Sequence, residues 1–197
     1  MSVVKLLSRI VAPEAAFDQN ANKEDREHNQ LMKSWHDNTY GITSDPLTQF
    51  AVVFSALIHD LDHPGVPNAT LVKEGTSLAT LYKNKSVAEQ NSVDLTWEIL
   101  MEDRFKDFRM AIYSNRLEKR RFRQLVVNVV MATDIIDSDL KKLRNARWDK
   151  AFQEKSLESK EELREDINRK ATIVLEHMIQ ASDVAHTMQH WNIYCKW

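Results

Sequence analysis

Three observations predict an all-α fold for this sequence. Only three glycines and four prolines occur among 197 residues, which are rich in strong helix formers such as Leu, Ala, Lys and Glu. In several segments apolar residues recur at intervals of three and four, the period of an amphipathic helix. With 43% hydrophobic residues, a chain of this length can bury a sizeable core. We therefore expect one compact multi-helix domain.

The first expected element is a short amphipathic helix that Pro13 closes. Its apolar residues lie at helical spacing and are Val3, Val4, Leu6, Leu7, Ile10 and Val11. They are too few for a membrane span, and Lys5 and Arg9 interrupt any signal-peptide core. The polar stretch 14–46 that follows is expected to be a surface insertion. No membrane segment is expected in this chain.

A buried helix is expected at residues 47–58. This segment, LTQFAVVFSALI, is longer than most strands and contains neither glycine nor proline. The loop PGVP stops the helical pattern soon afterwards. Shorter helical segments are then expected at 68–74 and 77–82, and a longer helix from about Ser86. The middle of the chain is thus helical on both sides of one polar loop.

Two capping residues mark helices in the C-terminal half. Asn115 is expected to cap a helix over 117–133, and Ser138 a helix over 139–152. After a highly charged stretch, a buried helical pattern returns over residues 171–197. The sequence shows neither an internal repeat nor a low-complexity tract.

Charge and cysteine content exclude several classes of function. A net charge of −2 and a pI near 6.4 give no broad attraction to nucleic acid or to anionic membranes. Cys195 is the only cysteine, so an intrachain disulfide and a zinc site of four cysteines are both impossible. A reducing compartment suits this composition. We expect a cytoplasmic protein, or one at the cytoplasmic face of a membrane if a longer form is anchored.

The densest group of chemically active residues is HDLDHPGVPN, which begins directly after the apolar helix. His59, Asp60, Asp62 and His63 fall within five residues. The helix dipole disfavours carboxylates at a helix C-terminus by up to about 1 kcal/mol, and a bound divalent cation reverses that sign. Imidazole and carboxylate are good zinc ligands, which favours a metal site. The alternative is that the histidines cap the helix and the aspartates are solvated.

A second polar group continues an apolar stripe late in the chain. Leu175, Ile179, Asp183, His186 and His190 step by four, four, three and four, which places them on one face of a helix. Ionisable groups on a buried stripe are costly without a partner, so Asp183 is a candidate distant ligand for the His59 site. Two alternatives stay open: an ion pair of Asp183 with a buried cation, and a local site of His186 and His190.

Four blocks in order resemble the class I 3′,5′-cyclic nucleotide phosphodiesterases. HDLDHPGVPN resembles the family signature HDxDHxGxxN, and LATLYKNKSVAEQNS, VVMATDI and IQASDVAHTMQHW resemble three later blocks. Together the blocks cover roughly residues 47–197. The resemblance implies a compact all-helical domain of the HD type, here truncated at both ends. The family motif HNxxHAxxV, with its general-acid histidine, is expected just ahead of Met1.

The resemblance also implies a cofactor and a set of site residues. It implies two divalent ions, zinc and magnesium or manganese, with His59, Asp60 and Asp183 as ligands and Asp60 bridging both. The residues that match the surroundings of the metal-bound water are His63, Asn68, Glu89 and Thr133. His186 matches a position that contacts the nucleotide. Two local explanations compete: Ser86 and Glu89 form a capping box, and Thr133 and Asp134 only end a helix.

The implied activity is hydrolysis of 3′,5′-cyclic nucleotides to 5′-nucleotides by a hydroxide that two metals activate, in signal transduction. The sequence does not decide between cAMP and cGMP. It departs from the family at Asn91 and Ser92, which replace two adjacent histidines. Two alternatives stay open: another HD-type metal phosphohydrolase, or a regulatory nucleotide-binding pseudoenzyme. Members of the resembling family often carry regulatory or membrane modules upstream. A longer form of this protein could carry such a module as well.

Overall fold

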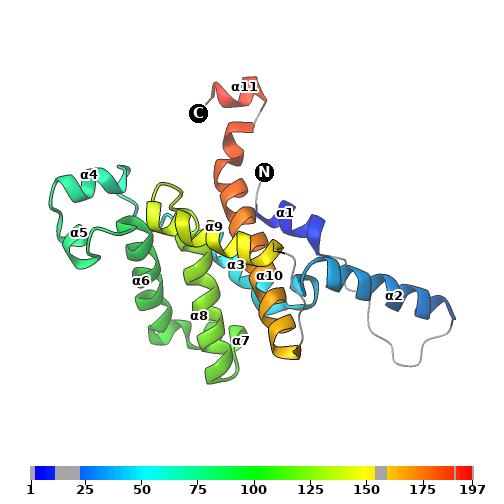
Figure 1. The fold of residues 1–197 in the computed structure, drawn as a ribbon. Coiled ribbons are helices and arrows are strands. Elements are labelled where there is room, and N and C mark those ends of the chain that lie inside the picture. The colour runs from blue at the N-terminus through cyan, green and yellow to red at the C-terminus, as the bar shows by residue number, and fades with distance from the viewer. Residues whose placement is uncertain (1–2, 12–22, 154–158, 189, 197) are drawn as a thin grey trace.

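The computed structural model describes residues 3–11, 23–153, 159–188 and 190–196. These residues form helices that turns and loops connect (Figure 1). The α-helices are α1 (Val3–Ile10), α2 (Lys23–Asn38), α3 (Pro46–Ile58), α4 (Asn68–Lys73), α5 (Ser77–Leu81), α6 (Val87–Met101), α7 (Lys106–Ile112), α8 (Arg116–Met131), α9 (Ser138–Phe152), α10 (Lys160–Asp183) and α11 (Trp191–Tyr194). Short 3₁₀ turns are η1 (Ile42–Ser44), η2 (Asp103–Phe105) and η3 (Val184–Met188). No strand occurs in these described ranges, and the predicted all-α class is confirmed.

Side chains fix where several of these helices start. Asn115 caps α8 by accepting from the backbone N–H groups of Leu117 and Glu118, as predicted. For α9 the prediction was wrong by one residue, because the carboxylate of Asp137 accepts the free N–H groups and Ser138 is already helical. The α3 cap is Asp45, which accepts from Thr48. Each cap satisfies donors that the first helical turn leaves unpaired.

The expected capping box of Ser86 and Glu89 is wrong. Ser86 precedes α6 with a φ of 37°, in the left-handed region, and its side chain makes no capping hydrogen bond. Residues that cap a helix in this position typically have an extended backbone, which Ser86 lacks. The purely local explanation for Glu89 therefore fails.

The helices α3 and α8 pack side by side at the centre of the molecule (Figure 1). One apolar cluster joins them to α6 around the fully buried ring of Phe122, with Phe54, Val93 and Val130. A second cluster joins the other side of α3 to α1 and α10, where Ile179 is buried. The end of α3 is therefore held between α6 and α8 on one side and α10 on the other, which positions the residues that follow it.

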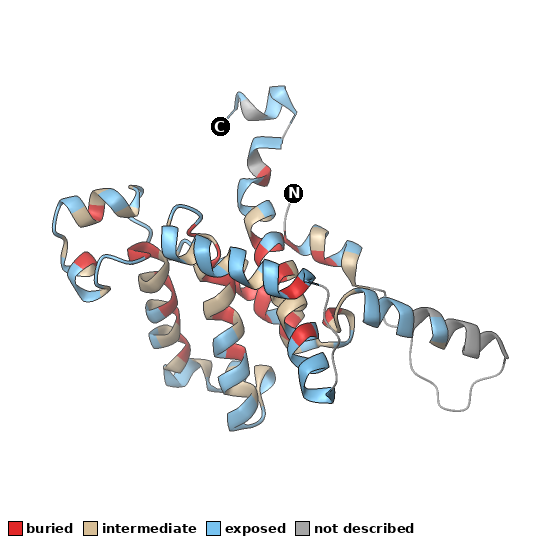
Figure 2. Cartoon of the chain, in the orientation of Figure 1, coloured by how far each residue is buried: buried red, intermediate tan, exposed pale blue. Residues whose placement is uncertain are grey.

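The helices α9 and α2 lie at the surface of this core. Figure 2 shows that α9 and the described part of α2 are exposed along most of their length. The predicted surface insertion 14–46 contains α2, which projects from the other helices (Figure 1). Ile42, which follows α2, is nevertheless buried against the α1 and α10 cluster. None of the helices in the described ranges combines the length and apolarity needed to cross a membrane.

The predicted helical stripe through His190 is wrong beyond Asp183. The helix α10 ends at this residue, a 3₁₀ turn follows, and His190 caps α11 by accepting from the N–H of Asn192. The polar residues of the stripe therefore do not share one helix face. The side chain of His186 lies outside the described residues.

Candidate metal centre

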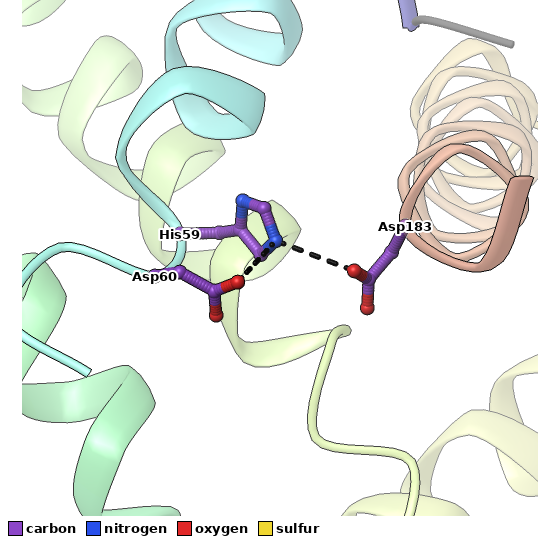
Figure 3. Close-up of side chains that lie close together, drawn as sticks. All are labelled: His59, Asp60 and Asp183. Atoms are coloured by element: carbon purple, nitrogen blue, oxygen red, sulfur yellow. Dashed lines mark ion pairs between the residues drawn. The ribbon is translucent and has the colours of Figure 1, made fainter. Parts of the chain in front are cut away.

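The three predicted metal ligands lie close together where α3 and α10 end (Figure 3). His59 and Asp60 directly follow α3, and Asp183 is the last residue of α10 on the opposite side. Nε2 of His59 lies 3.2 Å from Oδ2 of Asp60 and 3.4 Å from Oδ1 of Asp183. One potential ligand atom of each residue lies within 4.8 Å of the others. The core packing of α3 and α10 thus brings together side chains that are far apart in the sequence.

The imidazole of His59 presents an unsatisfied nitrogen to this cluster. Nδ1 lies 3.1 Å from the carbonyl oxygen of Ala56, which can only accept, so Nδ1 carries the proton of the neutral ring and Nε2 a lone pair. Among the described residues, Nε2 is one of two buried side-chain polar atoms without a partner of hydrogen-bonding geometry. Its nearest polar neighbours are the carboxylates of Asp60 and Asp183. A buried imidazole nitrogen beside two carboxylates fits a divalent cation.

The carboxylates dominate the electrostatics of the cluster. The Asp183 carboxylate is the largest influence and raises the pKa of His59, burial acts in the opposite direction, and Asp60 raises the pKa further. Asp183 is exposed, with 39% of its side chain accessible, as is Asp60 with 65%. The expectation of a buried Asp183 is therefore wrong, because the stripe emerges from the core as α10 ends. Open carboxylates leave room for a cation to enter.

An apolar hollow adjoins the cluster. It includes both His59 and Asp183, and most of its remaining wall is apolar, with Phe54, Leu57 and Phe108 among the contributors. A wall of this kind lowers the local dielectric constant and strengthens electrostatic interactions at its edge. The three candidate ligands therefore lie at the boundary between an apolar surface and solvent.

A second polar cluster, which we call the Asn68 network, joins α4, α6 and the end of α8. The amide nitrogen of Asn68 donates to Oε2 of Glu89 at 2.8 Å and to Oδ2 of Asp134 at 3.4 Å. Its amide oxygen accepts from the N–H of Ala88 at 2.9 Å. Both ends of one amide thus connect three segments, which explains the presence of Glu89 better than a helix cap does.

Two acids share this network. Burial raises the pKa of Glu89, the negative charge of Asp134 adds to the increase, and Asn68 and His63 act in the opposite direction. Asp134 is buried, and its Oδ1 accepts from the N–H groups of Ile136 and Asp137. From the sequence pattern alone, Asp134 is expected only at a helix terminus. Its position beside Thr133 in a family block was the available signal.

The remaining predicted site residues make local contacts. Nδ1 of His63 accepts from the N–H of Gly65 at 3.0 Å, and the hydroxyl of Thr133 donates to the carbonyl of Val130 at 2.7 Å. His63 is close enough to Glu89 to influence the pKa of its carboxyl. The structure therefore links His63 to the Asn68 network, and the role of Thr133 stays a prediction.

A helical domain that carries a His–Asp cluster suited to a divalent cation is typical of the helical metal-dependent phosphohydrolases. The family model for 3′5′-cyclic nucleotide phosphodiesterase matches residues 22–197. Because this match covers most of the sequence, the chain belongs to the 3′,5′-cyclic nucleotide phosphodiesterase family. This family is metal-dependent. The family predicted from the four sequence blocks is confirmed.

Known proteins of this family are similar over three quarters of the chain. The "Probable 3′,5′-cyclic phosphodiesterase pde-1" of Caenorhabditis elegans is 28% identical over 151 residues, which are 77% of this chain and 20% of that protein. The "Dual specificity calcium/calmodulin-dependent 3′,5′-cyclic nucleotide phosphodiesterase 1C" of Mus musculus is 28% identical over 149 residues, 75% of this chain and 19% of that protein. The chain spans about a fifth of the length of these relatives.

Solved structures support the fold. The phosphodiesterase domain of the RhoPDE fusion protein from the choanoflagellate Salpingoeca rosetta superposes with a TM-score of 0.59 at 22% identity. The superposition covers 77% of this chain and 44% of that chain. A second structure, of the same organism's rhodopsin phosphodiesterase domain, gives a TM-score of 0.59 at 24% identity over 81% of this chain and 48% of the other.

Proposed function

We propose that this chain contributes to hydrolysis of 3′,5′-cyclic nucleotides, cAMP, cGMP or both, to 5′-nucleotides in signal transduction. The observation that carries the proposal is the buried Nε2 of His59 beside two carboxylates, in a chain of a metal-dependent family. The relatives named above are phosphodiesterases of cyclic nucleotides. A reducing, cytoplasmic location, which the single cysteine suits, is part of the same proposal.

We assign His59, Asp60 and Asp183 as metal ligands. His59 would bind through Nε2, because the hydrogen bond of Nδ1 to Ala56 fixes the tautomer and the ring orientation. Zinc and magnesium, or manganese, are the proposed ions, since imidazole with carboxylate suits the first and carboxylate with water the others. When bound, such ions activate water at neutral pH and neutralise phosphate oxygens.

The Asn68 network orients groups beside this centre. Asn68 holds Oε2 of Glu89 and Oδ2 of Asp134 in fixed places, and the raised pKa of Glu89 favours a carboxyl that can keep a proton. We assign His63, Asn68, Glu89 and Thr133 to the hydrogen-bonding surroundings of the reacting water, and His186 to a contact with the nucleotide. The assignment of His186 depends on the family resemblance alone.

The test is hydrolysis of cAMP and cGMP by the purified chain, and by any longer protein that contains it, with Zn²⁺ and Mg²⁺ added. Asp183→Asn should lower kcat/KM by at least about 100-fold, since even residues that only support metal ligands cost 10- to 100-fold. Asp149→Asn, which changes an exposed carboxylate on α9, is the matched control and should retain activity. Absence of turnover in every form with metal bound would overturn the proposal.

A regulatory role without turnover is the second candidate function. It is favoured by Asn91 and Ser92, which replace two histidines of the resembling family block. Equilibrium binding distinguishes the two functions. Nucleotide binding without hydrolysis, in protein that contains bound zinc, would support the regulatory role.

A further inference from the structure

Two adjacent residues of α6 reach the loop that carries the candidate metal ligands. The hydroxyl of Ser92 donates to the carbonyl oxygen of Leu61 at 2.7 Å. The side-chain amide of Asn91 donates to Oδ2 of Asp62 at 3.2 Å. Adjacent residues of a helix thus bind adjacent residues of the loop between Asp60 and His63. We call this pair of contacts the α6 brace.

The braced loop has a conformation that needs support. The N–H of Leu61 donates to the carbonyl of Ile58, and the N–H of His63 to the carbonyl of Asp60, both at 3.0 Å, so the loop consists of two tight turns. Within the second turn Asp62 has a φ of 59°, in the left-handed region that non-glycine residues adopt at a cost. Contacts from outside the loop, such as those of the α6 brace, help to offset that cost.

The helix behind the brace is firmly packed. Ser92 is completely buried, and the next residue, Val93, lies in the apolar cluster around Phe122. One turn later, the buried hydroxyl of Thr96 donates to the carbonyl of Ser92 at 2.6 Å, within α6 itself. Ser92 therefore connects a rigid part of the core to a loop that has no apolar anchor between Asp60 and His63 other than the half-buried Leu61.

We propose that Ser92 and Asn91 are positioning residues, which hold the loop of Asp60 and His63 in the geometry that binds a divalent cation. They act through the loop backbone and Asp62, without contact with the cation. This inference depends on the proposed function for the identity of the bound ion, and on the structure alone for the brace.

Zinc affinity tests the brace with a matched pair of variants. Ser92→Ala removes the buried hydroxyl that binds the loop, and Thr96→Val removes a buried hydroxyl of the same helix that does not. We expect Ser92→Ala to weaken Zn²⁺ binding about 10- to 100-fold and Thr96→Val to leave it unchanged, as measured by competition with a chelating dye. Equal affinities of the two variants would overturn the inference.

Hydrogen exchange in metal-free protein separates this inference from the proposed function. In Ser92→Ala the amides of Leu61 and His63 should exchange about tenfold faster than in Thr96→Val, since the turns that protect them lose their support. If the wild type binds no zinc, the proposed function fails and the exchange rates still test the brace. If Ser92→Ala does not fold, the same exchange measurement is made on Asn91→Ala, which removes the other contact of the brace at a half-buried position. Unchanged exchange at both amides would overturn the inference.

Discussion

The two polar clusters of this protein satisfy their hydrogen bonds to very different degrees. In the Asn68 network every polar group of the Asn68 amide has a partner, and Asp134 accepts from two further N–H groups. In the cluster of His59, Asp60 and Asp183 a buried nitrogen has no hydrogen bond. A saturated network stabilises the fold, whereas an unsatisfied buried nitrogen is available to an added ligand. The contrast separates a supporting structure from a binding site.

The largest expected effect comes from breaking the saturated cluster. Asn68→Ala should lower the free energy of unfolding by about 3 kcal/mol, because hydrogen bonds to charged groups contribute about 1.5–3 kcal/mol each and the two carboxylates lose their shared donor. The measurement is urea denaturation of metal-free protein at about pH 8. Asp183→Asn under the same conditions should change the value by no more than about 0.5 kcal/mol. Equal losses would contradict the contrast between the clusters.

Zinc should narrow the difference in stability between these two variants. At a zinc concentration of about 100 times Kd, the wild type should gain about 2.7 kcal/mol of stability. Asp183→Asn, with an affinity about 100-fold lower, should gain only about 0.4 kcal/mol at the same concentration. Thermal denaturation with and without zinc measures both values. A similar gain in the two proteins would place the bound ion outside the cluster of Figure 3.

A smaller effect concerns pH and the half-buried acid of the saturated cluster. Because the folded pKa of Glu89 is raised, mainly by burial, its ionisation destabilises the fold, and this contribution grows as pH rises from the unfolded pKa through the folded one. Relative to the wild type, Glu89→Gln should therefore become more stable as pH rises from about 4 to about 7. Denaturation at several pH values checks the trend. A difference that is constant with pH would mean that the carboxyl of Glu89 is not perturbed.

Local sequence signals predicted most of the helices but only one of the caps discussed above. The position of Asn115 predicted the start of α8, but Ser138 was preferred to Asp137 although both are good capping residues. The spacing of Leu175 and Ile179 correctly indicated buried positions. It could not show that α10 ends at Asp183, since no glycine or proline marks that point in the sequence. A helix end without a local signal is decided by what the preceding turn packs against.

By itself the sequence determined the helical class and the family, and it predicted three residues suited to hold a metal. These conclusions depend on the composition, on the period of the apolar residues and on short motifs, all of which can be seen in the sequence without the fold. Only the tertiary structure decided that Asp183 reaches His59, that Asn68 joins Glu89 to Asp134, and that Ser92 donates to the carbonyl of Leu61. These contacts join distant segments, and the packing of α3, α6, α8 and α10 around a shared core sets their distances.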